Sequence, residues 1–210
     1  RILVTTFTRT LATELRRTLR RMFREAGVSF SRMTVQNLHR FARSYLRDAG
    51  ETVRVVGAEQ RDAFWKRAMQ QETLGLPEAF YREEWSEVIQ AQGIDNRGAY
   101  LRARRVGRGT RLPRQQRRAV WAVLGAYREA LDEGTWLEFP DVVRRAQRHI
   151  ASSVAPFQAV LADEIQDFGE SDLRLLRALA QPGPNDLFMV GDTFQRIYGT
   201  GTSMLRCGIE

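Results

Sequence analysis

The chain has 210 residues, and because 43% of them are hydrophobic and 28% are charged, its composition is that of a folded protein and not of a disordered one. One cysteine and two histidines exclude a disulfide framework and a cysteine-rich or histidine-rich metal site. The 33 basic and 25 acidic side chains give a net charge of +8, which favours an anionic partner such as nucleic acid; the alternative is that surplus arginine serves only solubility.

The first predicted element is a buried strand over residues 1–6, and an amphipathic helix follows it. Because the chain opens inside this strand without a methionine, we expect it to be part of a longer protein. Thr8 is the expected N-cap of the helix, and Gly27 is its expected stop. The helix carries arginines opposite its apolar stripe, for which a solvated face is the usual interpretation and phosphate binding the alternative. They are Arg16, Arg17, Arg20, Arg21 and Arg24.

The middle of the chain is predicted to be mainly helical, after a short strand over residues 31–34 and a helix over residues 35–49. The expected helices cover residues 61–73, 77–92 and 113–132. Aromatic residues are spread through this part, and we expect most of them in the core. They are Trp65, Phe80, Trp85, Tyr100, Trp121 and Tyr127. Residues 100–118 are dense in arginine and glycine, which predicts either a flexible basic segment beside a nucleic-acid backbone or a solvated loop.

The last part of the chain alternates between helices and strands. The helices are expected at residues 139–152 and 171–181, and the strands at 157–162 and 186–190. Such alternation predicts an α/β fold, in which helices cover a parallel sheet. Because strands occur at both ends of the chain, we expect one sheet domain at residues 1–49 and 137–210, interrupted by a helical insertion at residues 50–136.

Polar residues follow the predicted strands, at the sheet edge where ligands bind in folds of this class. Asp163 and Glu164 come directly after one strand, and Gly191, Asp192 and Gln195 come after the next. Adjacent carboxylates suit a nucleotide-bound Mg²⁺: the first meets the ion, directly or through water, and the second accepts a proton from an attacking water. Gln195 is placed to contact a terminal phosphate. For the acidic pair taken alone, the alternative is an ordinary surface turn.

Four segments resemble sequence motifs of the UvrD/Rep-type superfamily I DNA helicases. Two segments near the start resemble motifs Ia and Ib: ILVTTFTRTLATEL and MTVQNLHRFARSYL, respectively. Two segments near the end resemble motif II (Walker B) and motif III: VLADEIQDFGESDLRLLRAL and DLFMVGDTFQRIYG, respectively. The resemblance implies a RecA-like sheet domain, subdomain 1A, with the helical insertion as subdomain 1B. It also implies the motor core of an ATP-dependent helicase or translocase, which uses ATP and Mg²⁺ and binds single-stranded DNA or a junction of single-stranded and duplex DNA.

The resemblance also implies roles for individual residues. It assigns Asp163 to the Mg²⁺ of bound ATP, Glu164 to activation of the attacking water, and Gln195 to sensing of the γ-phosphate. Contacts with DNA fall on residues of motifs Ia, Ib and III, among which the tyrosine of motif III stacks on a base. These residues are Phe7, Thr8, Arg9, Thr34, Gln36 and Tyr198.

The chain departs from the family pattern in several places. Thr200 and Gly201 stand where a tryptophan and an arginine commonly follow the motif III tyrosine. Arg9 stands where motif Ia commonly has an asparagine, and Gln36 stands where motif Ib commonly has a histidine. The only lysine, Lys66, lies outside any glycine-rich cradle, so these 210 residues contain no P-loop. We therefore expect ATP hydrolysis from a longer parent protein and not from this chain alone.

Two further functions remain open on the sequence: a non-catalytic nucleic-acid-binding or regulatory module that kept the fold, and the helicase subunit of a helicase–nuclease. No apolar run is long enough to cross a bilayer and no signal peptide is recognisable, so we expect a soluble, cytoplasmic protein without a membrane partner. DNA repair is the process that the resemblance suggests.

Overall fold

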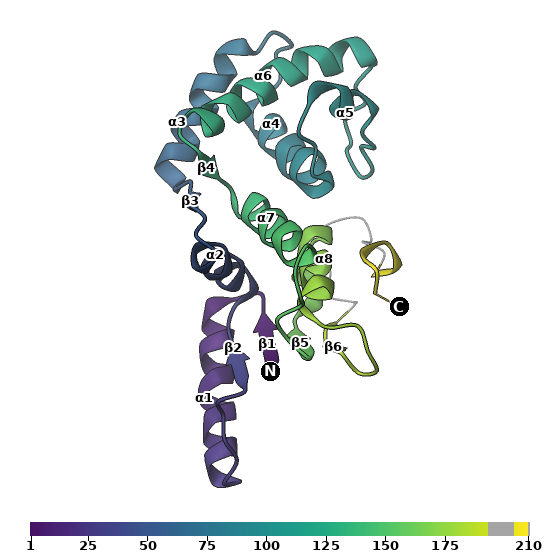
Figure 1. Cartoon of the computed structure of the whole chain (residues 1–210). Coiled ribbons are helices and arrows are strands. Elements are labelled where there is room, and N and C mark those ends of the chain that lie inside the picture. The colour runs from purple at the N-terminus through teal and green to yellow at the C-terminus, as the bar shows by residue number, and fades with distance from the viewer. Residues whose placement is uncertain (193–203, 210) are drawn as a thin grey trace. The chain divides into compact units, whose positions relative to one another are not determined.

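The computed structural model describes residues 1–192 and 204–209 (Figure 1). Two compact units make up the chain: Arg1–Thr52 with Val142–Glu210, here called the sheet unit, and Val53–Asp141, here called the helical unit. The assignment of a subdomain 1A and an inserted subdomain 1B, with boundaries after residues 49 and 136, stays a prediction. No helix within the described ranges is long and apolar enough to cross a membrane.

The sheet unit is built on a four-stranded parallel sheet with the strand order β2-β1-β5-β6 (Figure 1). Its strands are β1 (Ile2–Thr6), β2 (Met33–Val35), β5 (Ala159–Asp163) and β6 (Leu187–Met189). This confirms the predicted α/β class with a parallel sheet. β5 extends one residue further than predicted, to Asp163, because that residue continues the parallel ladder opposite Thr6 of β1.

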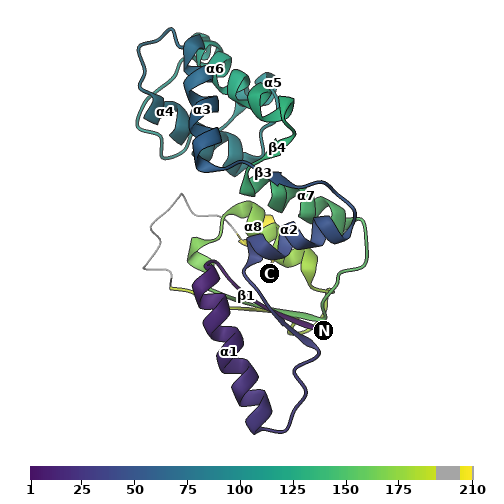
Figure 2. The ribbon, with the colours of Figure 1, turned by 90° about the vertical axis from the view of Figure 1, so that its left-hand side faces the viewer.

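Helices cover the sheet on both sides. The longer ones are α1 (Arg9–Glu25), α2 (Leu38–Asp48), α7 (Phe139–Ala151), whose first residues belong to the helical unit, and α8 (Glu170–Leu179). Figure 2 shows α2 and α8 on one side of the strands and α1 on the other. A short 3₁₀ turn, η5 (Met204–Cys207), packs on α8.

Two helix starts show how capping sets the boundaries. The Thr8 hydroxyl caps α1, as predicted, by accepting from the backbone N of Leu11 at 3.3 Å. The second helix begins at Leu38, three residues later than predicted. Val35 is part of β2, and the Asn37 side chain caps the helix by accepting from the backbone N of Arg40 at 3.1 Å.

The helical unit packs around aromatic side chains. It contains α3 (Ala58–Ala68), η1 (Met69–Gln71), α4 (Glu78–Glu84), the π-helix η2 (Trp85–Gln90), α5 (Arg97–Arg102) and α6 (Arg114–Glu133), with a parallel pair of short strands, β3 (Arg54–Val55) and β4 (Trp136–Leu137). Trp65 stacks on Tyr127 with ring centroids 3.9 Å apart, and Trp85 meets Tyr127 edge-on at 4.8 Å. The prediction of an aromatic core is confirmed, with Trp121 only partly buried at its margin.

The prediction of a flexible basic segment at residues 100–118 is wrong for the residues that face the interior, Tyr100, Arg105 and Arg108. The carboxylate of Glu84 is fully buried; Arg105 donates to it at 2.5 and 2.8 Å, and Arg108 at 3.2 Å. Tyr100 lies in α5 and donates to the same carboxylate at 2.8 Å; burial, and then the negative charge of Glu84, raise the pKa of its hydroxyl. The segment is therefore anchored by buried ion pairs, and its arginines are not all available to a partner.

Candidate functional site

The ends of three strands meet at one edge of the sheet. Thr6, the last residue of β1, pairs with Asp163, the last residue of β5. After β6, Val190 donates its N–H to Ala162 at 2.8 Å and accepts from the N–H of Ile165 at 3.1 Å. The loops that follow β1, β5 and β6 therefore lie side by side. This edge is the carboxyl end of a parallel sheet, where such folds bind ligands.

The loop after β5 holds Glu164 in an unusual backbone conformation. Glu164 has φ 57° and ψ 42°, in the left-handed region that residues other than glycine rarely adopt. Its N–H donates to the Asp163 side chain at 3.0 Å. Keeping a residue in this region costs on the order of 1–3 kcal/mol of conformational strain, and such residues cluster at functional sites. The turn presents two adjacent carboxylates in a fixed arrangement at the end of the strand.

Gln166 links this loop to the loop after β6, and sequence reasoning gave it no role. Its side-chain N–H donates to the carboxylate of Glu164, and its side-chain oxygen accepts from the backbone N of Asp192 at 3.1 Å. The only signal in the sequence was its place inside the motif II segment. The contact makes Gln166 a positioning residue for Glu164.

Gly191 is required by the close approach of the same two loops. A Cβ at this position would lie 2.6 Å from both the side-chain oxygen of Gln166 and Cγ1 of Ile165. Real Cβ atoms do not approach other atoms this closely, so any larger residue must displace these side chains or separate the loops.

Replacing Gly191 with alanine is expected to destabilise the sheet unit by about 1–3 kcal/mol, the usual cost of overpacking. The backbone N–H of Ile165, bonded to Val190, should exchange with deuterium faster in the variant. Gly183→Ala is the matched control, since a Cβ there meets its nearest neighbour, the carbonyl oxygen of Gln181, only at 3.9 Å. Equal exchange and equal melting temperatures in the two variants would remove the steric role of Gly191.

Phe7 is held at the edge by residues from other elements. Its ring lies 5.6 Å from that of His39, edge-on, and 5.8 Å from that of Phe168. His39 is itself paired with Asp172 at 3.1 Å. The side chain of Asn37 donates to the carbonyl oxygens of Thr6, at 3.2 Å, and Phe7. This supporting shell was missed, because nothing in the sequence shows which distant residues surround the ring.

The other residues expected to contact DNA, and the expected phosphate sensor Gln195, divide into three groups. Thr8 and Arg9 are exposed and follow Phe7 directly. Thr34 pairs with Leu3, and so lies back from the strand ends, while Gln36 donates to the Ser44 hydroxyl at 3.2 Å. Gln195 and Tyr198 lie outside the described residues. The described part of the sheet edge thus brings together Phe7, Thr8, Arg9, Asp163 and Glu164.

The site fits a metal ion only if a ligand completes its coordination. Within the described ranges, no group of three or more His, Cys, Asp or Glu residues could hold a metal. Mg²⁺ in nucleotide sites commonly takes one or two carboxylates and otherwise phosphate oxygens and waters, which suits the Asp163–Glu164 pair. The buried hydroxyls of Thr5 and Thr6 have no hydrogen-bond partner among the described residues. An unsatisfied hydroxyl beside Asp163 is consistent with a site that is completed by a bound ligand or its waters.

Comparison with protein families identifies the family of the chain. The model of the UvrD/REP helicase N-terminal domain matches residues 1–202. The chain belongs to this family. A search of curated proteins found no match. Membership in the UvrD/REP helicase family gives the chain the role of a helicase motor-core domain, and implies use of nucleotide, metal and nucleic acid by the family in general.

Proposed function

We propose that this chain is part of the motor core of an ATP-dependent DNA helicase or translocase, with the sheet unit as subdomain 1A and the helical unit as subdomain 1B. The observation that carries the proposal is the shared edge of the sheet, where the carboxylates of Asp163 and Glu164 lie next to the loop of Phe7, Thr8 and Arg9. One strand end thus carries residues suited to nucleotide chemistry, and its neighbour carries residues suited to DNA.

On the nucleotide side, bound Mg²⁺–ATP supplies the transferable phosphoryl group and a counter-charge for its oxygens. Asp163 would hold the ion, directly or through water, and Glu164 would accept the proton of the attacking water. Gln166 holds one carboxylate oxygen of Glu164 and leaves the other for that water. Gln195 is proposed to contact the terminal phosphate. The chain has no P-loop, so this half-site acts only together with a phosphate-binding loop from elsewhere in a parent protein.

On the DNA side, Phe7 offers a ring that is partly exposed and packs against the rings of His39 and Phe168. A fixed aromatic face stacks on unpaired bases without regard to sequence, which suits a protein that moves along DNA. Thr8 and Arg9 supply a hydroxyl and a charge for the adjoining phosphates. Tyr198 is proposed as a second stacking residue, and Thr34 and Gln36 as further contacts.

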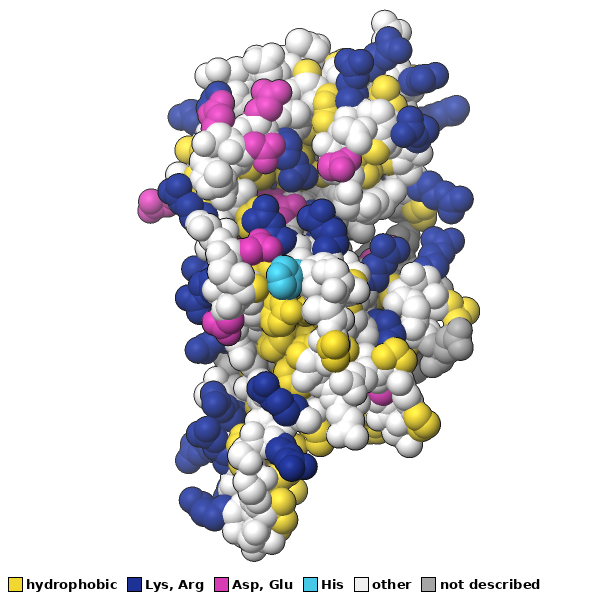
Figure 3. Space-filling model, in the orientation of Figure 1, with side chains coloured by type: hydrophobic (Ala, Val, Ile, Leu, Met, Phe, Trp, Pro, Cys, Tyr) yellow, Lys and Arg dark blue, Asp and Glu magenta, His cyan; other side chains and the backbone are white. Residues whose placement is uncertain are grey.

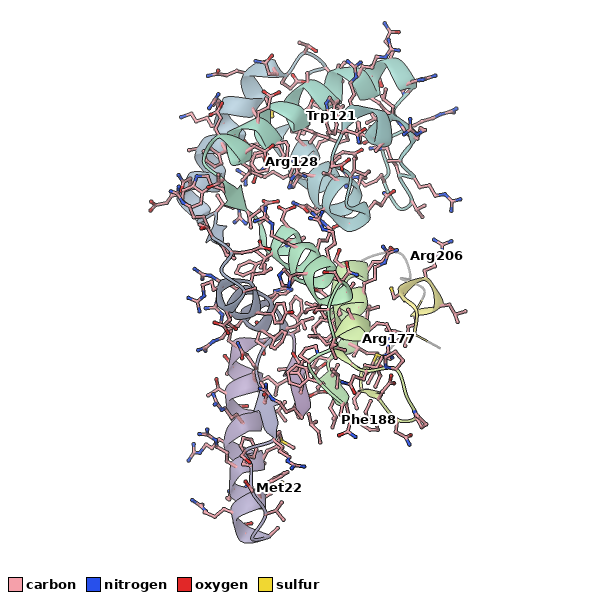
Figure 4. The ribbon with its side chains drawn as sticks, viewed as in Figure 1. Met22, Trp121, Arg128, Arg177, Phe188 and Arg206 are labelled. Carbon is pink, nitrogen blue, oxygen red and sulfur yellow. The ribbon has the colours of Figure 1, made fainter. Side chains whose placement is uncertain are left out.

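Replacing Phe7 with alanine is expected to weaken binding of single-stranded DNA by about 1–3 kcal/mol, the usual contribution of one stacked base. Titration of a fluorescent oligothymidylate at fixed salt measures the loss. Phe188→Ala is the matched control, because Phe188 is 63% exposed on the edge strand β6, which β5 separates from β1 and its loop (Figure 4). Loss of affinity in both variants, or in neither, would argue against a stacking role for Phe7.

A non-catalytic nucleic-acid-binding module is the second candidate function. It is favoured by Thr200 and Gly201, which replace the tryptophan and arginine common after the motif III tyrosine. Nucleotide turnover by the parent protein distinguishes the two candidates. The motor hydrolyses ATP when single-stranded DNA is added, whereas the module binds DNA with no hydrolysis.

A further inference from the structure

One face of α1 is densely and almost uniformly basic. The helix contains six arginines and two glutamates, so it accounts for half of the net charge of +8. At 100° per residue the arginines fall within one side of the helix, and we call this side the arginine face. Its members are Arg9, Arg16, Arg17, Arg20, Arg21 and Arg24. Figure 3 shows the dark blue side chains that gather over this helix, at the lower left.

These arginines are exposed, and within the described part of the chain none of the six forms an ion pair. Arg20 alone has an aromatic neighbour, with its guanidinium 5.6 Å from the ring of Phe30. Some arginines elsewhere do have carboxylate partners: Arg67 meets Glu133 at 2.7 Å, and Arg177 meets Asp186 at 2.5 Å. On the arginine face, six neighbouring charges lack such compensation among the described residues.

The arrangement acts against the stability of the helix. Arg16 and Arg20, Arg17 and Arg21, and Arg20 and Arg24 are pairs of like charge four residues apart, and each pair destabilises a helix. The first turn has no acidic residue, and Arg9 places a positive charge at the end of the helix where the dipole favours a negative one. A bound polyanion would relieve all of these repulsions together.

The side chains of this face also border a shallow hollow along the helix. It is lined by Thr13, Glu14, Arg16, Arg17, Thr18, Arg20, Arg21 and Arg24. Hydroxyl and guanidinium donors thus line it together with a single carboxylate, which suits an anionic ligand with many acceptor oxygens.

We infer that the arginine face binds the phosphate backbone of single-stranded DNA, as a continuation of the contacts at Phe7, Thr8 and Arg9. The inference rests on the proposed function, since Arg9 joins the two surfaces at the start of α1. A nucleic acid fits better than an anionic membrane. The apolar residues Leu11, Leu15 and Leu19 lie opposite the arginines, partly buried on the side where α1 packs against β1 and β2, and so cannot insert into lipid in the same orientation. The exposed Met22, 54% accessible near the end of the helix (Figure 4), offers only a single apolar contact.

The test is the salt dependence of binding to a fluorescent oligothymidylate of about 20 nucleotides, over about 50 to 200 mM salt. Arg17, Arg20 and Arg24 are replaced together by alanine. If these three neutralise phosphates, the slope of log K against log salt should become shallower by about 2, and affinity near 0.1 M salt should fall by about tenfold or more. Replacement of the same three residues by lysine should keep most of the slope, because the charges remain.

The matched control is the triple replacement of Arg40, Arg43 and Arg47 by alanine on α2. These residues are exposed and have the same spacing as the three on α1, so their replacement removes the same charge. The inference predicts a near-normal slope for this control. An equal loss in both triple variants would mean that only net charge matters and would overturn the inference, as would a normal slope in the α1 variant.

Two further readouts separate this inference from the proposed function. If the unaltered chain binds DNA, and Phe7→Ala weakens binding while the α1 variant does not, only the arginine face is rejected. If the unaltered chain fails to bind DNA at every salt concentration, both are rejected.

A membrane is the alternative partner for this face. If the α1 alanine variant lost binding to vesicles containing phosphatidylserine while its DNA binding stayed intact, the face would be reassigned to a membrane. Circular dichroism should show the α1 alanine variant folded and at least as stable as the unaltered chain, because the substitution removes repulsion between like charges.

Discussion

Replacement of Glu164 by glutamine in a parent protein that carries a P-loop is expected to lower DNA-stimulated ATP hydrolysis by a factor of about 10² to 10⁴, the usual contribution of a general base. Glutamine has nearly the same shape and can still bond to Gln166, but it cannot accept the proton of the attacking water. Binding of ATP should change little. The steady-state rate of phosphate release measures the first effect, and a fluorescent nucleotide analogue measures the second.

The control for this experiment is Glu170→Gln. Glu170 lies at the start of α8, and its carboxylate forms a partly exposed ion pair with Arg174 at 2.5 Å. It has the same chemistry as Glu164 and a nearby position, but it is not at the strand end, so turnover should remain close to normal. If Glu164→Gln turned over ATP as fast as this control, Glu164 would not be the base.

The second large effect is expected in the helical unit. Replacement of Glu84 by alanine should destabilise this unit by about 3–5 kcal/mol, because the largely buried Arg105 would keep its positive charge without a carboxylate partner, and Arg108 would keep only the exposed Glu83. Their side chains are 6% and 12% exposed, and that of Glu84 is 0% exposed. Tyr100 would also lose its acceptor. The buried cluster should therefore decide whether the segment after α5 stays folded.

Tryptophan fluorescence during unfolding in urea isolates this effect. All four tryptophans, Trp65, Trp85, Trp121 and Trp136, belong to the helical unit, so their signal does not follow the sheet unit. Glu133→Gln is the control, since Glu133 and Arg67 form an ion pair whose side chains are each 58% exposed. Such a pair contributes at most about 1 kcal/mol. A similar shift of the unfolding midpoint in both variants would show that the buried cluster stabilises the unit no more than an exposed ion pair does.

The sequence was sufficient for the features that depend on local pattern. Apolar runs that end in polar residues located the strand ends, and the alternation of strands with helices predicted the parallel sheet. Thr8 was recognised as a cap because the signal for an N-cap lies within four residues of the helix start. The family was recognised because the motifs are short and continuous.

Features that depend on distant residues could not be predicted. Arg105 and Arg108 looked like parts of a solvated loop, since their common partner, Glu84, lies 21 and 24 residues earlier and nothing local marks it as buried. The role of Gln166 depends on the left-handed turn at Glu164, which places its amide between two loops. Similarly, the shell around Phe7 comes from α2 and from the segment between β5 and α8, which meet only in the folded sheet unit.

The central claim is that one edge of the sheet couples nucleotide chemistry to DNA. Its most direct test is the ATP turnover of the parent protein, measured with and without single-stranded DNA. The proposed motor predicts turnover that is slow alone and rises many-fold on addition of an oligothymidylate. Turnover that is unaffected by DNA, or no turnover in a folded parent protein that binds both nucleotide and DNA, would contradict it.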